Sequence, residues 1–168
     1  MSELHSLLQA IGSWGSQHEF VRRGRTRVFA RTLREVLWLI EVQKSRTAQA
    51  QVTINLGVYL PTVANREGTA TESPETPDCQ WWARLGELGP AADDVWWSIG
   101  SPRATRASAE EICALLDSVG LPAFRARSSL RALIALWEGG DCGLTEVQRR
   151  RWLEAAKRQL GSGPHAGG

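Results

Sequence analysis

The chain has 168 residues, 42% of them hydrophobic and 23% charged, with a formal net charge of +2. This composition is typical of a globular protein and excludes a disordered chain, and the length suits one domain with its own core. No apolar run reaches the length of a membrane span, and the N-terminus lacks the basic start and apolar segment of a signal peptide. We therefore expect a cytoplasmic protein with no membrane segment.

The first predicted element is a short amphipathic helix over residues 2–12. Apolar side chains recur there at helical spacing. They are Leu4, Leu7, Leu8 and Ile11. Ser2 is a suitable N-cap, and Gly12 or Gly15 is expected to end the helix.

Three antiparallel strands are predicted next, over residues 26–32, 35–44 and 51–60, because β-branched and aromatic residues dominate these segments. Alternation places one apolar row of the second and third strands on a common core face. This row contains Val36, Trp38, Ile40, Val42, Val52, Ile54, Leu56, Val58 and Leu60. The opposite face is half polar. Its polar residues include Glu41, Gln43, Thr53, Asn55 and Tyr59.

Residues 62–78 contain turn formers and small polar residues without periodicity, which predicts a long, mobile surface loop. Two further strands are expected, over 79–85 and 95–99, with a turn-rich connection between them.

The pattern changes to helices from Ser108, where a capping box with Glu111 predicts a helix start. Gly120 followed by Pro122 is expected to end this helix. A second helix is predicted to begin near Ser128.

The second helix is expected to end at Gly139, and a third begins with a capping box formed by Thr145 and Gln148. The side chains expected on the buried side of this third helix are Trp152, Leu153, Ala156 and Leu160. The order of elements predicts a two-layer α+β domain over residues 1–160. It has an N-terminal helix, an antiparallel meander sheet of four to five strands and C-terminal helices packed on the sheet. Residues 161–168 are expected to be a disordered tail.

Few residues carry recognisable catalytic or metal-binding chemistry. The cysteines Cys79, Cys113 and Cys142 are widely spaced and form no CxxC pair, so we expect reduced structural thiols and no metal site. No phosphate-binding glycine loop is present, and no cofactor is expected. A nucleophile would need His5 or His18 as its base, and both lie on or near the first predicted helix.

Polar residues inside the apolar strands are more informative. Gln43, Lys44 and Ser45 end the second predicted strand, and Asn55 and Gly57 interrupt the third. Gly57 indicates a bulge or the close approach of another group. Gln43 and Asn55 have the parity to face the same side of the sheet, where they either line a binding cleft or satisfy one another. Arg84, near tryptophans, could stack on an aromatic ring.

The pair Trp96–Trp97 divides between two environments if the segment is extended. Trp97 shares a face with Val95 and Ile99 and is expected in the core. Trp96 is then the outward residue and our best candidate for a contact residue, although cover by the first helix is an equal alternative.

Four blocks resemble a bacterial family catalogued as domain of unknown function 4304. They are "EVQKS" at 41–45, "INLGVYLP" at 54–61, "CQWWARLGEL" at 79–88 and "DVWWSIG" at 94–100. The resemblance covers roughly residues 10–125 and implies a bacterial, single-domain, cytoplasmic protein. It implies no activity, because the family has none assigned. The long 62–78 loop departs from the family pattern.

Three functions remain open. The favoured one is a non-catalytic binding protein, in one version immunity-like with a toxin as its protein partner. Its candidate binding face consists of Gln43, Lys44, Ser45, Asn55, Arg84 and Trp96. The first alternative is an enzyme acting on a small or phosphate-bearing substrate through Lys44, Ser45, Arg84 and Asp94. The second is nucleic-acid binding through arginines at 22–34 and 149–151. For the arginines at 22–34, a solvated edge strand is the preferred explanation. Nothing indicates the oligomeric state.

Overall fold

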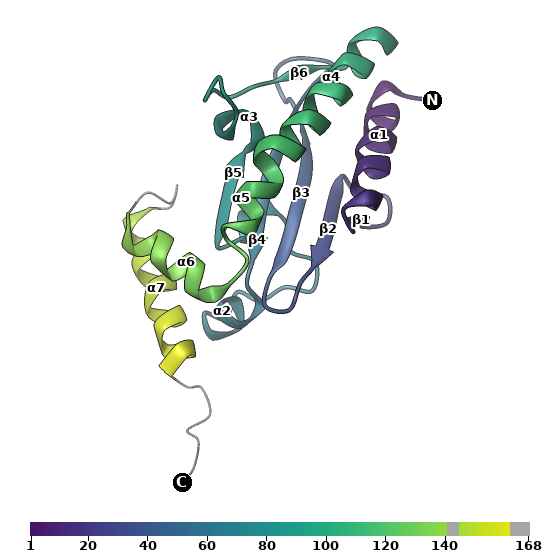
Figure 1. Ribbon diagram of the computed structural model, residues 1–168. Helices are drawn as coiled ribbons and strands as arrows, with labels where there is room; N and C mark the ends of the chain where they lie inside the picture. Colours follow the sequence, from purple (N-terminus) through teal and green to yellow (C-terminus); the bar gives the residue numbers. More distant parts are fainter. Residues whose placement is uncertain (141–144, 162–168) are drawn as a thin grey trace.

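The computed structural model describes residues 1–140 and 145–161 and has an α+β fold, which confirms the predicted class (Figure 1). The sheet is antiparallel, with the strand order β1-β2-β3-β4-β5, and β6 pairs with the same edge of β4 as β5 does. The strands are β1 Val21–Arg22, β2 Val28–Thr32, β3 Leu37–Lys44, β4 Gln51–Tyr59, β5 Trp81–Arg84 and β6 Trp97–Ser98. The sheet is thus the predicted meander with a short additional strand, β1, before it.

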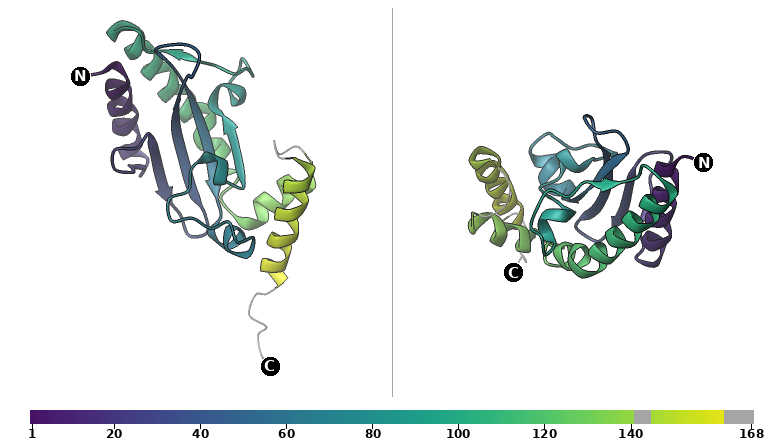
Figure 2. Two further views of the ribbon diagram at one scale, coloured as in Figure 1. Left: turned by 180° about the vertical axis from the view of Figure 1, so that it is seen from behind. Right: turned by 90° about the horizontal axis from the view of Figure 1, so that it is seen from above.

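Helices cover one face of this sheet and one of its ends. The helices are α1 Glu3–Gln17, α2 Pro61–Arg66, α3 Leu85–Leu88, α4 Pro102–Leu115, α5 Leu121–Arg125, α6 Leu130–Glu138 and α7 Glu146–Gly161. Figure 2 shows α1 and α4 side by side on the same face of the sheet, whereas α6 and α7 stack at its end. In the described ranges the other face carries no long helix, and part of it is covered by a 3-10 turn at Thr76–Asp78 that contacts β3 and β4.

The register of the central strands confirms the predicted core face. Trp38 pairs with Val58, Ile40 with Leu56, and Val42 with Ile54. All six side chains belong to the main core, which the helices complete. Phe124, from α5, stacks on Trp38 with the two ring centroids 4.9 Å apart. The alternating apolar pattern of β3 and β4 therefore determines which face the helices cover.

The two tryptophan pairs divide as strand alternation predicts. Trp81 is only 4% exposed and Trp97 only 3% exposed, and both lie in the main core. Trp82 is 40% exposed, and Trp96 is half-buried. The prediction that Trp97 is the core member and Trp96 the outward one is confirmed.

The first helix starts where predicted but extends further. The Ser2 hydroxyl accepts a hydrogen bond from the His5 backbone N–H at 3.3 Å, as expected of an N-cap. The helix then continues through both glycines to Gln17, so its predicted end was wrong. The extension places Trp14 in the core. Burial of this ring outweighs the low helix propensity of glycine.

The segment predicted as a loop over 62–78 contains regular structure. Residues Pro61–Arg66 form α2, and Thr76–Asp78 form a single 3-10 turn. Pro61 occupies the first turn of α2, where a missing N–H costs nothing. Val63 and Ala64 are buried, and this burial stabilises a helix too short to show a periodic pattern.

The helix expected from Ser108 begins earlier, at Pro102. The Ser101 hydroxyl caps it by accepting from the Ala104 N–H at 3.2 Å. Ser108 lies inside the helix, and its hydroxyl donates to the Ser98 carbonyl at 2.7 Å. The predicted stop at Gly120 was also wrong, because a π-helical turn over Leu116–Gly120 connects α4 directly to α5.

The last two helices largely follow the sequence. Ser129 caps α6, and the capping box of Thr145 and Gln148 at α7 is confirmed. Leu160 is 47% exposed, contrary to its predicted burial. Helix α7 contacts the end of α2 through ion pairs of Arg151 and Arg158 with Glu67. Cys142 and residues 162–168 of the predicted tail lie outside the described residues.

Candidate functional site

The sheet face that α1 and α4 leave open carries a patch of polar side chains. Glu41, Asn55 and Arg84 lie in one row across β3, β4 and β5, because Asn55 is the register partner of both other residues. Gln43 and Thr53 form the next row. We call these five residues the polar face. Strand alternation places them opposite the apolar core rows.

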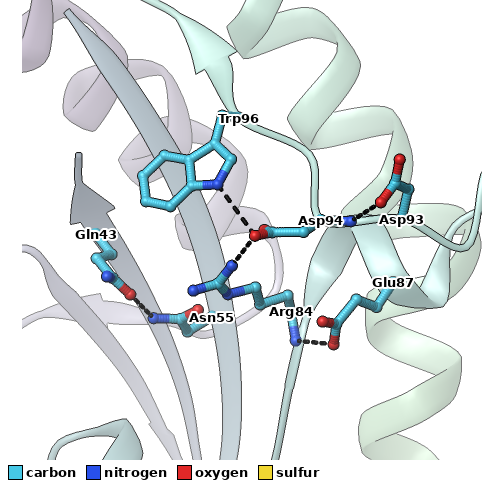
Figure 3. A network of polar contacts seen from close by, with 7 residues as sticks. All are labelled: Gln43, Asn55, Arg84, Glu87, Asp93, Asp94 and Trp96. Carbon is cyan, nitrogen blue, oxygen red and sulfur yellow. Dashed lines mark hydrogen bonds and ion pairs between the residues drawn. The ribbon is translucent and has the colours of Figure 1, made fainter. Parts of the chain in front are cut away.

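A network of contacts connects the polar face to the segment before β6 (Figure 3). The Asn55 side-chain amide donates to Gln43 Oε1 at 2.8 Å. Arg84 forms an ion pair with Asp94, and Trp96 Nε1 donates to the same carboxylate at 3.2 Å. The Arg84 guanidinium also lies 5.5 Å from the Trp96 ring centroid. This cation–π contact confirms the prediction that Arg84 stacks on a tryptophan.

Two buried polar atoms of this face are unpaired. Within the described chain, Asn55 Oδ1 and Thr53 Oγ1 have no hydrogen-bond partner. Asn55 is 6% exposed and Thr53 is fully buried. A buried polar group without a partner costs about 1–3 kcal/mol. The face therefore carries hydrogen-bonding capacity that the rest of the described structure does not use.

A small second core bounds the polar face on one side. It contains Val28, Leu39, Tyr59, Ala64 and Cys79. Cys79 packs directly onto Gly57, where an added Cβ would lie 2.5 Å from the cysteine Sγ. The prediction that Gly57 marks the close approach of another group is confirmed. At the boundary, the Thr76 hydroxyl donates to the Glu41 carboxylate at 2.6 Å.

The position of Cys79 predicts a thiol that does not react in the folded state. Burial raises the pKa of this thiol far above its ordinary value, and the neighbouring Asp78 and Glu41 carboxylates raise it further. Because only the thiolate is nucleophilic, iodoacetamide near pH 8 should leave Cys79 unmodified until the protein unfolds. Peptide mass spectrometry with and without denaturant measures this. Modification in the native protein as fast as in a Cys79 peptide would contradict the expected burial.

A cavity of about 320 Å³ adjoins the polar face at the β3–β4 hairpin. Its lining residues are Gln43, Ser45, Arg46, Thr47, Gln51 and Trp96. The Ser45 hydroxyl accepts hydrogen bonds from the backbone N–H groups of Thr47 and Ala48, at 3.3 and 2.9 Å. Ser45 thus shapes the hairpin turn at the edge of the site.

Four of the six residues proposed for the binding face come together: Gln43, Asn55, Arg84 and Trp96. Ser45 lines the adjoining cavity. Lys44 does not join them, because it follows Gln43 in the strand and has the opposite parity. Including Lys44 in this face was wrong.

The predicted binding face left out two residues of the polar face, Glu41 and Thr53. Both were predicted on the half-polar side of the sheet, by the same alternation that placed Gln43 and Asn55 there. No sequence signal pointed to Thr76, which reaches Glu41 from a segment 35 positions later.

The other candidate groups have local partners. The His18 ring lies 3.3 Å from an Asp117 carboxylate oxygen and 4.5 Å from the Trp14 ring centroid. Arg31 pairs with Glu19 and lies over the Trp38 ring. In the described ranges, no cluster of three or more His, Cys, Asp and Glu side chains could hold a metal ion. Within the same ranges, no helix has both the length and the apolar character needed to cross a membrane.

Comparison with known proteins gives one match. A family model described as domain of unknown function (DUF4304) matches residues 22–126, which is more than half of the chain. The matched range contains the whole sheet except Val21, and therefore all of the polar face, but it ends before α6 and α7. No curated protein and no solved structure matches the chain.

Proposed function

The chain belongs to the family described as domain of unknown function (DUF4304); because that description assigns no activity, we propose a function from the polar face. In this proposal the protein binds another protein through that face and performs no catalysis. The concrete version is an immunity-like role in the bacterial cytoplasm, in which the bound partner is a toxin that the protein neutralises.

The accessible tryptophan and arginine side chains beside the polar face are the observation that supports this proposal most directly. Tryptophan and arginine are frequent energetic hot spots of interfaces, and here the Arg84 guanidinium lies over the Trp96 ring. Trp82, 40% exposed on the same face of β5, extends the contact surface.

The placement of the groups that an enzyme would need favours binding over catalysis. Arg84 is paired with Asp94, and Ser45 is occupied by the turn amides. Lys44 lies on the opposite side of the sheet. These groups do not converge on one point where a substrate atom could react, as a catalytic site requires.

The arginines that could contact nucleic acid are largely engaged within the protein. Arg22 donates to the backbone carbonyls of Arg25 and Thr26, and Arg23 donates to that of Pro74. Arg151 pairs with Glu67. These contacts give the arginines a structural role and support the ranking of nucleic-acid binding below protein binding.

Affinity capture with matched surface variants tests the proposal. The purified chain should capture a specific partner from cells of its source, and Trp82→Ala should lower the recovery at least about tenfold, which corresponds to about 1.4 kcal/mol. Leu160→Ala, at a position of α7 that is 47% exposed, should leave the recovery unchanged. Circular dichroism would establish that both variants fold.

The same variants separate the possible outcomes. If both variants capture every partner as the unchanged chain does, the polar face is not the interface. Co-expression tests the immunity-like version, because the unchanged chain should relieve toxicity of the partner and Trp82→Ala should not.

A further inference from the structure

A cavity of about 670 Å³ lies at the end of the sheet where β2 turns into β3. Its walls come from the β2–β3 turn, the end of β4, α2, residues 70–74 and the first residue of α6. Figure 1 shows this turn and α2 at the same end of the sheet. The cavity shares no lining residue with the polar face or with the cavity beside Trp96, so it is a separate site. Its volume is in the range typical of small-molecule pockets.

The inner wall of this cavity is apolar. It is formed by Val36, Leu60 and Leu130, all of which are buried and belong to the main core. These residues come from a turn, a strand end and a helix start that lie far apart in the sequence. A wall made from core side chains offers a ligand a fixed apolar surface, which is the usual basis of small-molecule binding.

Residues 70–74 form a second wall, and contacts to the sheet hold them in place. The Thr71 backbone N–H donates to Tyr59 Oη at 3.1 Å. Arg23 donates to the backbone carbonyl of Pro74, which is itself buried. Both Thr71 and Pro74 line the cavity. The cavity is therefore bounded by anchored segments and is largely preformed.

The polar groups that this lining leaves without partners include three donors. Tyr59 Oη accepts from Thr71, but in the part of the chain that the structure describes no group accepts its O–H proton. Within the same residues, the side chains of Arg34 and Asn65 form no hydrogen bond or ion pair, and both are exposed at the cavity. Because a donor needs an acceptor, these groups favour a ligand that carries an acceptor oxygen.

The charges at the cavity favour a neutral ligand. The lining contains one base, Arg34, and two acids, Glu35 and Glu72. Glu35 already accepts from the Leu130 backbone N–H at 3.4 Å. An anionic ligand would thus meet no excess of positive charge, and the unpaired donors oppose a cation. A neutral carbonyl group satisfies both conditions.

We propose that this cavity binds a compact, neutral and mainly apolar molecule that carries a carbonyl group. The apolar body packs against Val36, Leu60 and Leu130, and the carbonyl oxygen accepts from the Tyr59 hydroxyl. This inference is independent of the proposed protein-binding function and adds a second site to the molecule. The family match ends at residue 126, so Leu130 lies beyond it and the matched range alone does not complete this site.

Two small compounds test the inference directly. Acetophenone and ethylbenzene have nearly the same size, and acetophenone alone has a carbonyl oxygen. Each is titrated into the full chain with ¹³C-labelled methyl groups, and the methyl signals of Leu60 and Leu130 are followed by NMR. Both compounds should shift these signals saturably, and acetophenone should bind at least about threefold more tightly, as one added hydrogen bond predicts. Tyr59→Phe should remove this preference, because it removes the donor and keeps the ring.

A matched pair of alanine variants tests the location. Ala70→Trp, at an exposed position of the lining, should fill the cavity and weaken the binding of both compounds at least about tenfold. Ala107→Trp, at an exposed position of α4 outside the lining, should not change it. Circular dichroism would establish that both variants fold. Equal affinity for the two compounds, no saturable shift, or unchanged binding by folded Ala70→Trp would each overturn the inference.

The two proposals fail separately. Trp82 does not line this cavity, so Trp82→Ala should bind acetophenone as the unchanged chain does while it loses the captured partner. Ala70→Trp should show the reverse, with acetophenone binding lost and the partner retained.

Discussion

Replacing Gly57 with alanine should lower the free energy of unfolding by about 2–3 kcal/mol, a large loss for a change of one methyl group. The added Cβ would lie 2.5 Å from the Sγ of Cys79 and 3.2 Å from its Cβ. Gly57 is central in β4 and pairs with β3 and β5, so the backbone cannot move without disturbing both neighbouring strands. Urea denaturation followed by tryptophan fluorescence measures this loss.

A second substitution at the opposing residue tests the cause. Cys79→Ala removes the sulfur atom that the new methyl group would meet, so the double variant should recover much of the stability lost by Gly57→Ala. Gly12→Ala is the control, because its added Cβ would lie 3.5 Å from the Phe29 ring, an ordinary contact. This helical position should gain about 0.5–1 kcal/mol. Additive effects at Gly57 and Cys79 would show that the close approach does not explain the glycine.

The two neighbouring tryptophans of β5 should respond very differently to substitution. Trp81→Ala should cost about 3–5 kcal/mol, since it empties a site of the main core. It also removes the ring over which the Arg127 guanidinium lies at 4.3 Å. A loss of this size approaches the total stability of a typical domain, so we expect the variant to be largely unfolded near 37 °C.

Trp82→Ala is the matched control, with the same residue type in the same strand and the opposite parity. Its side chain is 40% exposed, and the loss of stability should be below about 1 kcal/mol. The melting temperatures of the two variants compare them directly. Similar melting temperatures would mean that β5 does not alternate between core and open face as described.

The sheet was predictable because its side-chain pattern has a short and strict period. A shift of one residue in β3 would move Trp38, Ile40 and Val42 from the core to the open face, so the apolar pattern allows only one register. The helix boundaries were less predictable. Ser108 matches a capping box with Glu111, but Ser101 followed by Pro102 forms an equally good start about two helical turns earlier. Burial of Thr105 and Ala109 decides between them.

The candidate site was predictable to the extent that it depends on alternation along single strands. Gln43 and Asn55 were placed on one face in this way, and Trp96 was identified as the outward tryptophan. The pairing of Arg84 with Asp94 depends on how the segment after β5 folds back, which no local pattern encodes. The unpaired state of Asn55 Oδ1 is likewise a property of three-dimensional packing and could not be derived from the sequence.

Both β5 and β6 attach to one edge of β4, so the chain must leave the sheet after β5 and return to the same edge at β6. The connection over residues 85–96 that makes this return is closely packed. Leu85 lies in the main core, and an added Cβ at Gly86 would lie 2.7 Å from the Asp93 carbonyl oxygen and from Val95. The positions of Asp94 and Trp96 beside the sheet are therefore fixed by this packed turn, and Gly86→Ala should displace both side chains even though it touches neither of them.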